Sequence, residues 1–266
     1  MKILVIGDPH GDLEKIKQIP IKGVDLILLT GDIGKADFAR KRFFENVERK
    51  KQGLKELKYD GKASKIAYKE ISDSTLNVLK YLSKFSPIYS ILGNVGNNMV
   101  KDYEVKKDEE KYKIKLPYLG REIKKIKEFH LTINRLRKIN ELRIGFLEYF
   151  SDVSWVKEFK PKDYKKSMKR AKKETEKAKK ILKRFGKIDI LICHQPPYGV
   201  LDKVGAPAPM HWRGKHAGSK AVLDYIKKYQ PRYVFCGHIH EGEGKVKIGK
   251  TQVYNLGVAG HKIIGL

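Results

Sequence analysis

The sequence predicts an α/β fold, because short apolar segments alternate with long charged segments along its 266 residues. Three observations support this class. The apolar segments are short and rich in β-branched residues, and several are apolar at every position, as expected of strands covered on both faces. The charged segments carry a single apolar stripe at helical spacing. No linker rich in glycine, proline or serine divides the chain, so we expect one domain over residues 1–266.

The individual elements follow from this pattern in chain order. Six apolar runs are expected as strands: Ile3 to Ile6, Val24 to Leu29, Ile88 to Leu92, Ile144 to Leu147, Ile188 to Cys193 and Tyr233 to Cys236. A hairpin that turns at Gly249 and Lys250 is expected over residues 245–255. Helices are expected after the cap residue Asp12, over 36–57 and 64–85 with Tyr59, Asp60 and Gly61 between them, and over 163–185.

The composition limits the class of protein. With 41% hydrophobic and 33% charged residues, the chain is expected to be globular and soluble. The apolar run at the amino terminus is too short for a signal peptide, and no stretch approaches the roughly 18 apolar residues of a membrane span. Cys193 and Cys236 do not make a disulfide framework. We therefore expect no membrane association and a cytoplasmic location.

The formal net charge of +27 is high for a chain of this length. A field this positive attracts polyanions, so RNA or DNA is one candidate partner. The alternative is a general lysine enrichment of the proteome, as in AT-rich genomes or many thermophiles. Charge alone indicates non-specific attraction and does not identify a binding site.

Side chains that bind metal ions follow five of the expected strands. Asp8 and His10 follow the first, Asp32 the second, Asn94 the third, His194 the fifth, and His238 and His240 the sixth. Ligands of an open α/β sheet bind at the carboxyl ends of its strands, so we expect these side chains to form one site. Each fragment alone is weak evidence, because Asp-x-His, Gly-Asp and Gly-Asn are common in turns. The prediction of one metal site therefore depends on the fact that all of these residues follow expected strands.

These residue types suit a pair of divalent transition metal ions. Imidazole and carboxylate together favour such ions over Ca or Mg, and we expect Mn, with Fe, Zn, Co or Ni as alternatives. The spacing in the Asp-x-His and His-x-His fragments lets both side chains of each fragment point the same way from extended backbone. Asp32 has two carboxylate oxygens and can bridge ions about 3.5–4 Å apart. Asn94 offers a neutral oxygen, which adds no negative charge where a phosphate must bind.

In this order, Asp-x-His, Gly-Asp, Gly-Asn, His and Gly-His-x-His, the chain resembles the calcineurin-like metallophosphoesterase superfamily over residues 8–240. The stretches HQPPYGVLD at 194–202, HAGSK at 216–220, CGHIHEG at 236–242 and NLG at 255–257 are similar to the branch of small metallophosphoesterase-domain-containing phosphoesterases. The resemblance implies a β-sandwich core flanked by helices, in four α/β/β/α layers, in place of a single open sheet.

The resemblance also implies a role for each metal ligand. One ion would be held by Asp8, His10, Asp32 and His240, and the other by Asp32, Asn94, His194 and His238, with Asp32 bridging. The implied reaction is in-line attack on phosphorus by a metal-bridging hydroxide, since the ions lower the pKa of bound water and neutralise charge on the phosphoryl oxygens. No Ser or Cys stands beside a base in these motifs, so a covalent nucleophile is not expected.

The sequence departs from the family pattern directly after Asn94. The family continues with a histidine, its usual general acid, and then an acidic residue, where this chain has Val95 and Gly96. General acid catalysis contributes typically 10²–10⁴-fold, so its loss affects poor alkoxide leaving groups most. The departure therefore bears on which esters the chain can hydrolyse.

Three interpretations of this departure are open. In the first, another group donates the proton, and His211 and His216 in the loop 205–219 are the candidates, although both also fit loop histidines without a chemical role. In the second, the substrate has a good leaving group or water serves as the acid; relatives without this histidine are typically phosphodiesterases. In the third, the chain is a binding or scaffold module with bound metal and little turnover. Because every metal ligand is retained, we favour an enzyme.

We therefore expect a metal-dependent phosphoric ester hydrolase that acts on a small phosphate ester, with phosphodiesters favoured over phosphomonoesters. The catalytic candidates are Asp32, Asn94, His211 and His216. Two alternatives remain: a nuclease that acts on RNA or DNA, motivated by the net charge, and the scaffold module, motivated by Val95. The sequence does not indicate the natural substrate or the oligomeric state.

Overall fold

The computed structural model describes residues 1–58, 60–206 and 208–266 and contains two β-sheets. The first sheet has the order β11-β1-β2-β3-β4, formed by His261–Gly265, Lys2–Ile6, Leu26–Leu29, Ile88–Ser90 and Phe129–Leu131. The second has the order β5-β6-β7-β8-β10-β9, formed by Arg135–Ile139, Leu142–Leu147, Ile190–Cys193, Tyr233–Cys236, Thr251–Asn255 and Gly244–Ile248.

Parallel pairing dominates the interior of both sheets. Strands β1 to β4 are parallel in the first sheet, and β6, β7, β8 and β10 are parallel in the second. The strands β11, β5 and β9 pair antiparallel at or near the edges. Parallel strands direct their carboxyl ends to the same edge of a sheet, so the loops after β1, β2 and β3 share one edge, as do the loops after β7 and β8.

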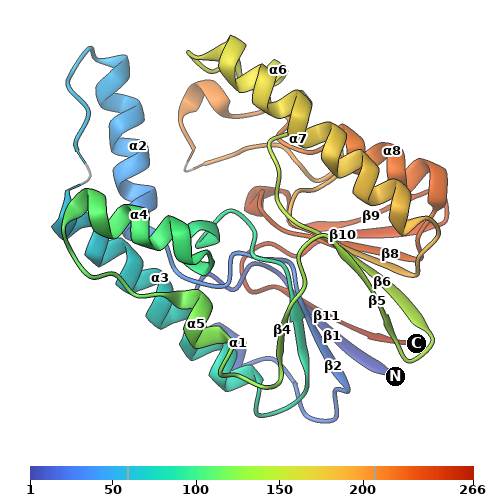
Figure 1. The fold of residues 1–266 in the computed structure, drawn as a ribbon. Coiled ribbons are helices and arrows are strands. Elements are labelled where there is room, and N and C mark those ends of the chain that lie inside the picture. Colours follow the sequence, from blue (N-terminus) through green and yellow to red (C-terminus); the bar gives the residue numbers. More distant parts are fainter. Residues whose placement is uncertain (59, 207) are drawn as a thin grey trace.

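Alternation along the strands divides the apolar side chains between two faces of each sheet. In β1, Ile3 and Val5 lie in the core between the sheets, together with Phe146 from β6. Leu4 and Ile6 of the same strand lie in a second core, under the helices of the first sheet. The helices of the second sheet cover a third core. The expected four-layer α/β/β/α sandwich is therefore confirmed (Figure 1).

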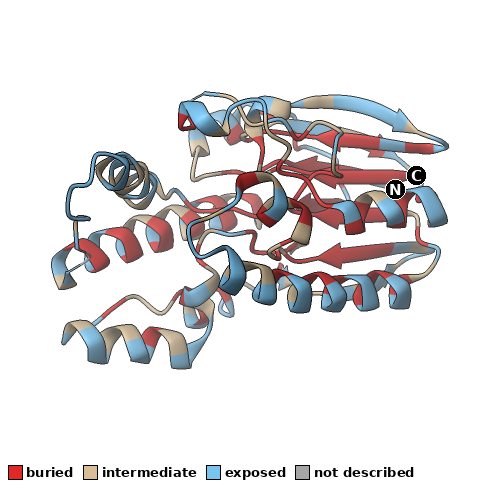
Figure 2. Cartoon of the chain, turned by 90° about the horizontal axis from the view of Figure 1, so that it is seen from above, coloured by how far each residue is buried: buried red, intermediate tan, exposed pale blue. Residues whose placement is uncertain are grey.

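The helices lie outside the two sheets. On the side of the first sheet these are α1 (Leu13–Lys17), α2 (Asp37–Lys51), α3 (Gly61–Leu82), α4 (Asp102–Tyr112) and α5 (Leu119–Ile123), and on the side of the second α6 (Val153–Phe159), α7 (Tyr164–Phe185) and α8 (Lys220–Tyr229). In α7 the expected apolar stripe is buried at Ala171, Ala178, Leu182 and Phe185, and most of the lysines around it are exposed (Figure 2). Among the described residues, no helix has the length and hydropathy needed to cross a bilayer.

The expected boundaries were wrong in several places. Helix α2 ends at Lys51, before the expected residue 57, and α3 starts at Gly61, which was expected between the helices. The carboxylate of Asp60 caps α3 by accepting from the backbone N–H of Ala63, whereas Tyr59 lies outside the described residues. Strands β4, β5 and β11 were not expected, because they are short or carry charged side chains at most exposed positions.

Candidate metal centre

The structure brings together all of the expected metal ligands at the strand ends of both sheets. We call this set the ligand cluster: Asp8 and His10 after β1, Asp32 after β2, Asn94 after β3, His194 after β7, and His238 and His240 after β8. The first sheet thus supplies both carboxylates, one imidazole and the amide, and the second sheet supplies three imidazoles. The site lies where the carboxyl edges of the two sheets meet.

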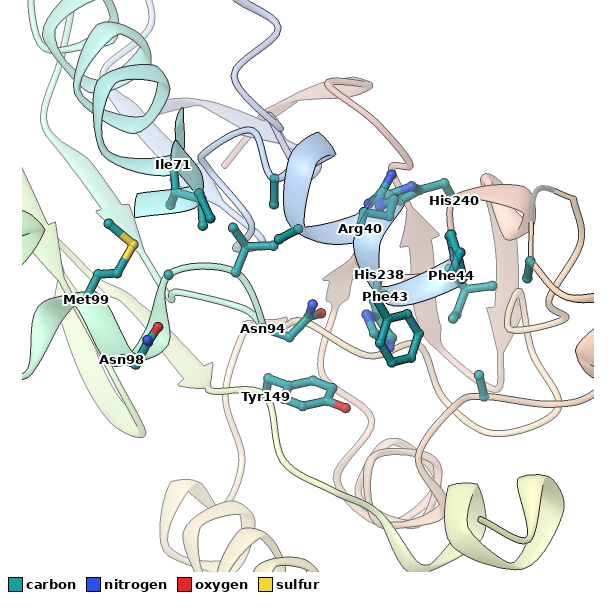
Figure 3. Close-up of a pocket in the computed structure, with 18 of the residues that line it drawn as sticks. Arg40, Phe43, Phe44, Ile71, Asn94, Asn98, Met99, Tyr149, His238 and His240 are labelled. Carbon is teal, nitrogen blue, oxygen red and sulfur yellow. The ribbon is translucent and has the colours of Figure 1, made fainter. Parts of the chain in front are cut away.

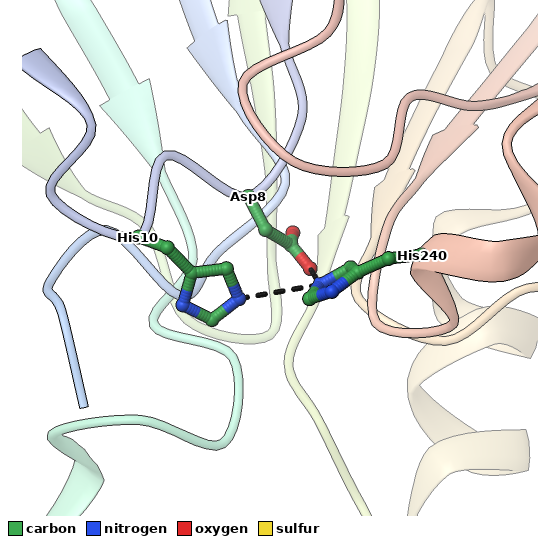
Figure 4. Close-up of side chains that lie close together, drawn as sticks. All are labelled: Asp8, His10 and His240. Carbon is green, nitrogen blue, oxygen red and sulfur yellow. Dashed lines mark hydrogen bonds and ion pairs between the residues drawn. The ribbon is translucent and has the colours of Figure 1, made fainter. Parts of the chain in front are cut away.

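The first half of the ligand cluster contains Asp8, His10 and His240 (Figure 4). The Nε2 atoms of His10 and His240 lie 3.2 Å apart, and their rings meet edge to face. The Nε2 atom of His240 also lies 3.4 Å from Oδ2 of Asp8. Three donor atoms therefore converge on one point, as the ligands of a single metal ion must.

The second half contains Asp32, Asn94, His194 and His238. The Nε2 atom of His194 lies 2.8 Å from Oδ1 of Asn94 and 3.5 Å from Oδ2 of Asp32. The ring of His238 lies 4.8 Å from the ring of His194, measured between centroids. The donor atoms of His194, Asn94 and Asp32 thus lie close enough together to bind a second metal ion, and the ring of His238 lies beside them.

One oxygen atom lies between the two halves. The Oδ2 atom of Asp32 is 3.9 Å from Nε2 of His10 in the first half and 3.5 Å from Nε2 of His194 in the second. The other oxygen of Asp32, Oδ1, accepts hydrogen bonds from the backbone N–H groups of Asn94 at 2.7 Å and Val95 at 2.8 Å. These bonds hold the carboxylate with Oδ2 toward the imidazoles, which is the orientation a bridging ligand needs.

The charge of the site also fits bound cations. Asp8 is fully buried and Asp32 is 3% exposed, and neither is paired with a lysine or arginine in the part of the chain that the structure describes. Burial opposes their ionisation, yet the attraction of His194 and the other neighbouring imidazoles keeps the pKa of both carboxyls below the usual range. Buried carboxylates without a basic partner are costly, and divalent ions would compensate them.

Burial and neighbouring charges shift the pKa values of the histidines in opposite directions. Burial alone would lower the pKa of His194, but the carboxylates of Asp32 and Asp8 raise it to about 10. Burial and the neighbouring His194 lower the pKa of His238 to about 3, and burial also lowers the pKa of His10. Without metal, His194 therefore carries a positive charge between the two carboxylates and must lose its proton to bind an ion, whereas the lowered pKa values of His238 and His10 favour the neutral form that binds metal.

Backbone and hydroxyl groups around the ligand cluster set its geometry. The hydroxyl of Thr30 donates to Oδ1 of Asp8 at 2.7 Å, and its carbonyl lies 3.0 Å from Nδ1 of His194. This second contact directs Nε2 of His194 toward the site. A Cβ atom at Gly93 would lie 2.3 Å from Oδ1 of Asp32, and one at Gly237 would lie 2.2 Å from Oδ1 of Asp8. Both glycines are required because the backbone approaches the carboxylates closely.

The loop histidines lie apart from the ligand cluster. His211 is in an exposed 3₁₀ turn, and His216 directs Nδ1 to Oδ1 of Asp202 at 2.7 Å. Neither is among the described residues that line the cavity at the site, whereas Val95 is. The structure therefore places neither His211 nor His216 in the wall of this cavity.

A cavity of about 680 Å³ opens beside the ligand cluster and is lined by Asn94, His238 and His240 (Figure 3). Tyr149, which follows β6, also lines it, and its ring lies 5.3 Å from His238 and 5.8 Å from His194 between centroids. Burial and the charge of Asp32 raise the pKa of Tyr149 to about 12, so its hydroxyl stays protonated. Sequence reasoning missed Tyr149, although its place after a strand end was an available signal.

Glu148, next to Tyr149, organises the backbone of the third ligand loop. Its carboxylate accepts hydrogen bonds at 2.8 Å from the backbone N–H groups of Leu92, Gly93 and Tyr149. These contacts fix the turn that presents Asn94. Burial of this side chain raises the pKa of Glu148.

Comparison with known proteins identifies the family. The family model of the calcineurin-like phosphoesterases matches residues 1–242. Metallophosphoesterase domain-containing protein 1 of Homo sapiens is 40% identical over 72 residues, which is 27% of this chain and 20% of the relative, and the Mus musculus protein matches equally. The aligned part therefore spans about a fifth of the length of these relatives.

Solved structures show the same fold. A dimetal phosphatase from Danio rerio superposes with a TM-score of 0.50 at 12% identity, over 98% of this chain and 88% of that one. A protein from Thermus thermophilus superposes with a TM-score of 0.51 at 18% identity, over 97% of this chain and 90% of that one. At sequence identities this low, the similarity shows a shared fold and carries no information about the substrate.

Proposed function

The chain belongs to the calcineurin-like phosphoesterase family, which consists of metal-dependent phosphoesterases, and on this premise we propose that it hydrolyses small phosphodiesters at a centre of two divalent ions. The observation that carries this proposal is the position of Oδ2 of Asp32, within 4 Å of imidazole nitrogens in both halves of the ligand cluster. A centre for one ion would not need a carboxylate oxygen between two sets of ligands.

The residues of the chain have distinct roles in this proposal. Asp8, His10 and His240 would hold one ion, Asn94, His194 and His238 would hold the other, and Asp32 would contribute to both. When bound, the two ions supply Lewis acidity, which lowers the pKa of water and neutralises charge on phosphoryl oxygens. Mn is the favoured ion, with Fe, Zn, Co or Ni as alternatives, because imidazole and carboxylate ligands suit them. Asn94, at the cavity wall, positions the ester against the ions without adding negative charge.

The substrate preference in this proposal follows from the wall beside Asn94. Val95 lines the cavity where the family usually has its acid, and a valine cannot protonate a leaving group. We therefore propose diesters with good leaving groups, or proton transfer from water. His211 and His216 remain candidates for the acid only with a substrate whose leaving group extends to the loop 205–219.

The test is hydrolysis of a nitrophenyl phosphodiester and the matching monoester with Mn²⁺, by the wild type and by Asn94→Ala. Nitrophenolate leaves without an acid, so a missing acid does not hide the activity. We expect metal-dependent turnover that Asn94→Ala lowers at least about 10²-fold, because ligand loss removes several kcal/mol of charge stabilisation. Asn77→Ala, on the exposed face of α3, is the matched control and should behave as the wild type.

The same assay separates the alternatives. Turnover of the diester with little turnover of the monoester supports the proposed class, and the reverse ratio replaces it with a phosphomonoesterase. Binding of two ions without any turnover would favour the scaffold module. Turnover of oligonucleotides, with binding that weakens steeply as salt increases, would favour the nuclease.

A further inference from the structure

The cavity at the ligand cluster extends to a group of aromatic side chains, which we call the aromatic end: Phe43, Phe44, Trp155, Phe159 and Trp212. Trp155 stacks on Phe159 with 5.0 Å between ring centroids, and Trp212 meets the edge of Phe159 at 5.6 Å. The ring centroid of Phe43 lies 6.3 Å from that of Trp212, so α2 and the segment 208–219 meet across the cavity. The aromatic end and the ligand cluster thus share one continuous space.

Helix α2 directs an apolar face to this space. Ala36, Ala39, Phe43 and Phe44 recur at the spacing of one helical face, and all of them line the cavity. No residue of α2 is buried, and Phe43 is 53% exposed. A surface helix normally packs its apolar face against the protein core, but here the face is turned to open cavity (Figure 3). The exposed apolar area is therefore available to a ligand.

The cavity carries little of the net charge. Among the described residues that line it, Arg40 is the single lysine or arginine, and Asp108 and Glu241 are acidic. The polar groups at the far wall already have partners, since the hydroxyl of Tyr68 donates to Asp108 at 2.6 Å and accepts from Asn98 at 2.8 Å. A groove for polynucleotide combines aromatic side chains with a track of basic residues along the backbone of the strand. This cavity has the aromatic residues without that track.

Building on the proposed function, we infer that the aromatic end binds an uncharged apolar group of the substrate. The substrate class is then a small phosphate ester with a bulky apolar organic group, in which the ligand cluster takes the phosphate and the aromatic end takes the organic part. An alkyl chain and an aromatic ring share this chemistry. The volume of about 680 Å³ lies within the range of pockets that enclose small organic ligands.

The first experiment compares nitrophenyl diesters whose second group is methyl, butyl, octyl or naphthyl. The leaving group is constant, so only binding of the second group varies. Each methylene that enters an apolar site strengthens binding about fourfold, so kcat/KM should rise on the order of fiftyfold from methyl to butyl. The octyl and naphthyl esters show whether a chain or a ring fits better. Equal kcat/KM for all four esters would overturn the inference.

The matched variants are Phe43→Ala at the aromatic end and Phe85→Ala in the turn that follows α3. Both side chains are partly exposed, Phe85 at 39%, and Phe85 does not line the cavity. Phe43→Ala should lower kcat/KM for the butyl ester at least about tenfold and leave the methyl ester within twofold. Phe85→Ala should preserve the dependence on chain length. An equal loss for both esters in Phe43→Ala would contradict a subsite for the apolar group.

Binding has a readout that does not depend on turnover. The chain contains two tryptophans, Trp155 and Trp212, and both lie at the aromatic end. Titration with octyl phosphonate should change tryptophan fluorescence saturably, with a Kd at least tenfold lower than that of methyl phosphonate, and more weakly in Phe43→Ala. If this holds while no ester is hydrolysed, the subsite stands and the proposed hydrolysis fails. Turnover with equal binding of both phosphonates overturns the subsite alone.

Discussion

The end of the cavity at the ligand cluster, which we call the ligand end, is formed by residues that follow strands of the two sheets, whereas the aromatic end is formed by helices α2 and α6 and by Trp212, outside the sheets. Asp8 and Asp32 are almost fully buried behind strands whose side chains fill two cores. Helix α2 buries none of its residues, and its Phe43 is half exposed. The difference separates two tasks: the chemistry requires fixed distances between ligands, and recognition of an apolar group requires surface and tolerates adjustment.

The largest effect is expected at the ligand that both halves of the cluster share. Asp32→Asn replaces a carboxylate oxygen within reach of His10 and His194 by a neutral group. Turnover of the nitrophenyl diester should fall at least about 10³-fold, because the negative charge that this carboxylate would supply to both proposed ions is lost. Asp37→Asn, at the exposed start of α2, is the control and should stay within twofold of the wild type. Turnover in Asp32→Asn within tenfold of the wild type would contradict a shared ligand.

Removal of a phenylalanine ring should destabilise the protein much more in the β-sandwich than in α2. Phe146 is fully buried between the sheets, so Phe146→Ala should lower the free energy of unfolding by about 3–5 kcal/mol. Phe43→Ala should lower it by less than about 1 kcal/mol, because the ring is half exposed. Urea unfolding of the metal-free proteins measures both. A large loss in Phe43→Ala would show that α2 is part of the structural core and not a wall for a ligand.

Metal uptake should release a proton at the ligand end. Near pH 8 the metal-free His194 is protonated, since its pKa is raised to about 10, and it must be neutral to bind an ion. Affinity for Mn²⁺ should therefore rise with pH, by up to about tenfold per unit between pH 7 and 9. Calorimetric titrations in two buffers of different ionisation enthalpy report the proton count. Identical heats in both buffers would show that His194 is already neutral.

The smallest effect is expected for the loop histidines with the nitrophenyl diester. His211 is exposed and His216 is engaged by Asp202, and neither lines the cavity. His211→Ala and His216→Ala should each leave turnover of this ester within about threefold, because nitrophenolate needs no acid. The same variants with an alkyl leaving group test whether either histidine donates a proton. A selective loss with the alkyl ester would assign that role.

The sequence predicted the ligand end far better than the aromatic end, for a physical reason. Each ligand directly follows a strand, and strand ends meet at one edge, so local position indicated a common site. The sandwich was not predictable from strand periodicity, which indicated an open sheet; it was expected from the resemblance of the motifs. The aromatic end joins α2, α6 and the segment 208–219, and no local pattern in the sequence shows that these segments meet.

Several elements were missed for related reasons. Strand β5 carries charged side chains at Arg135, Arg137 and Lys138 because it is at the edge of its sheet, and this hides the apolar signal. The apolar stripe of α2 looks like ordinary packing in the sequence, because a face toward a cavity has the same periodicity as a face toward a core. Only the three-dimensional arrangement distinguishes the two.

The most direct test of the account is a titration of metal-free protein with Mn²⁺ in which bound ions per chain and hydrolysis of the nitrophenyl diester are followed together. We predict that turnover appears with metal and reaches its maximum when two ions are bound per chain. Two bound ions without hydrolysis, or hydrolysis that is complete before any metal is added, would contradict a phosphoesterase built on this ligand cluster.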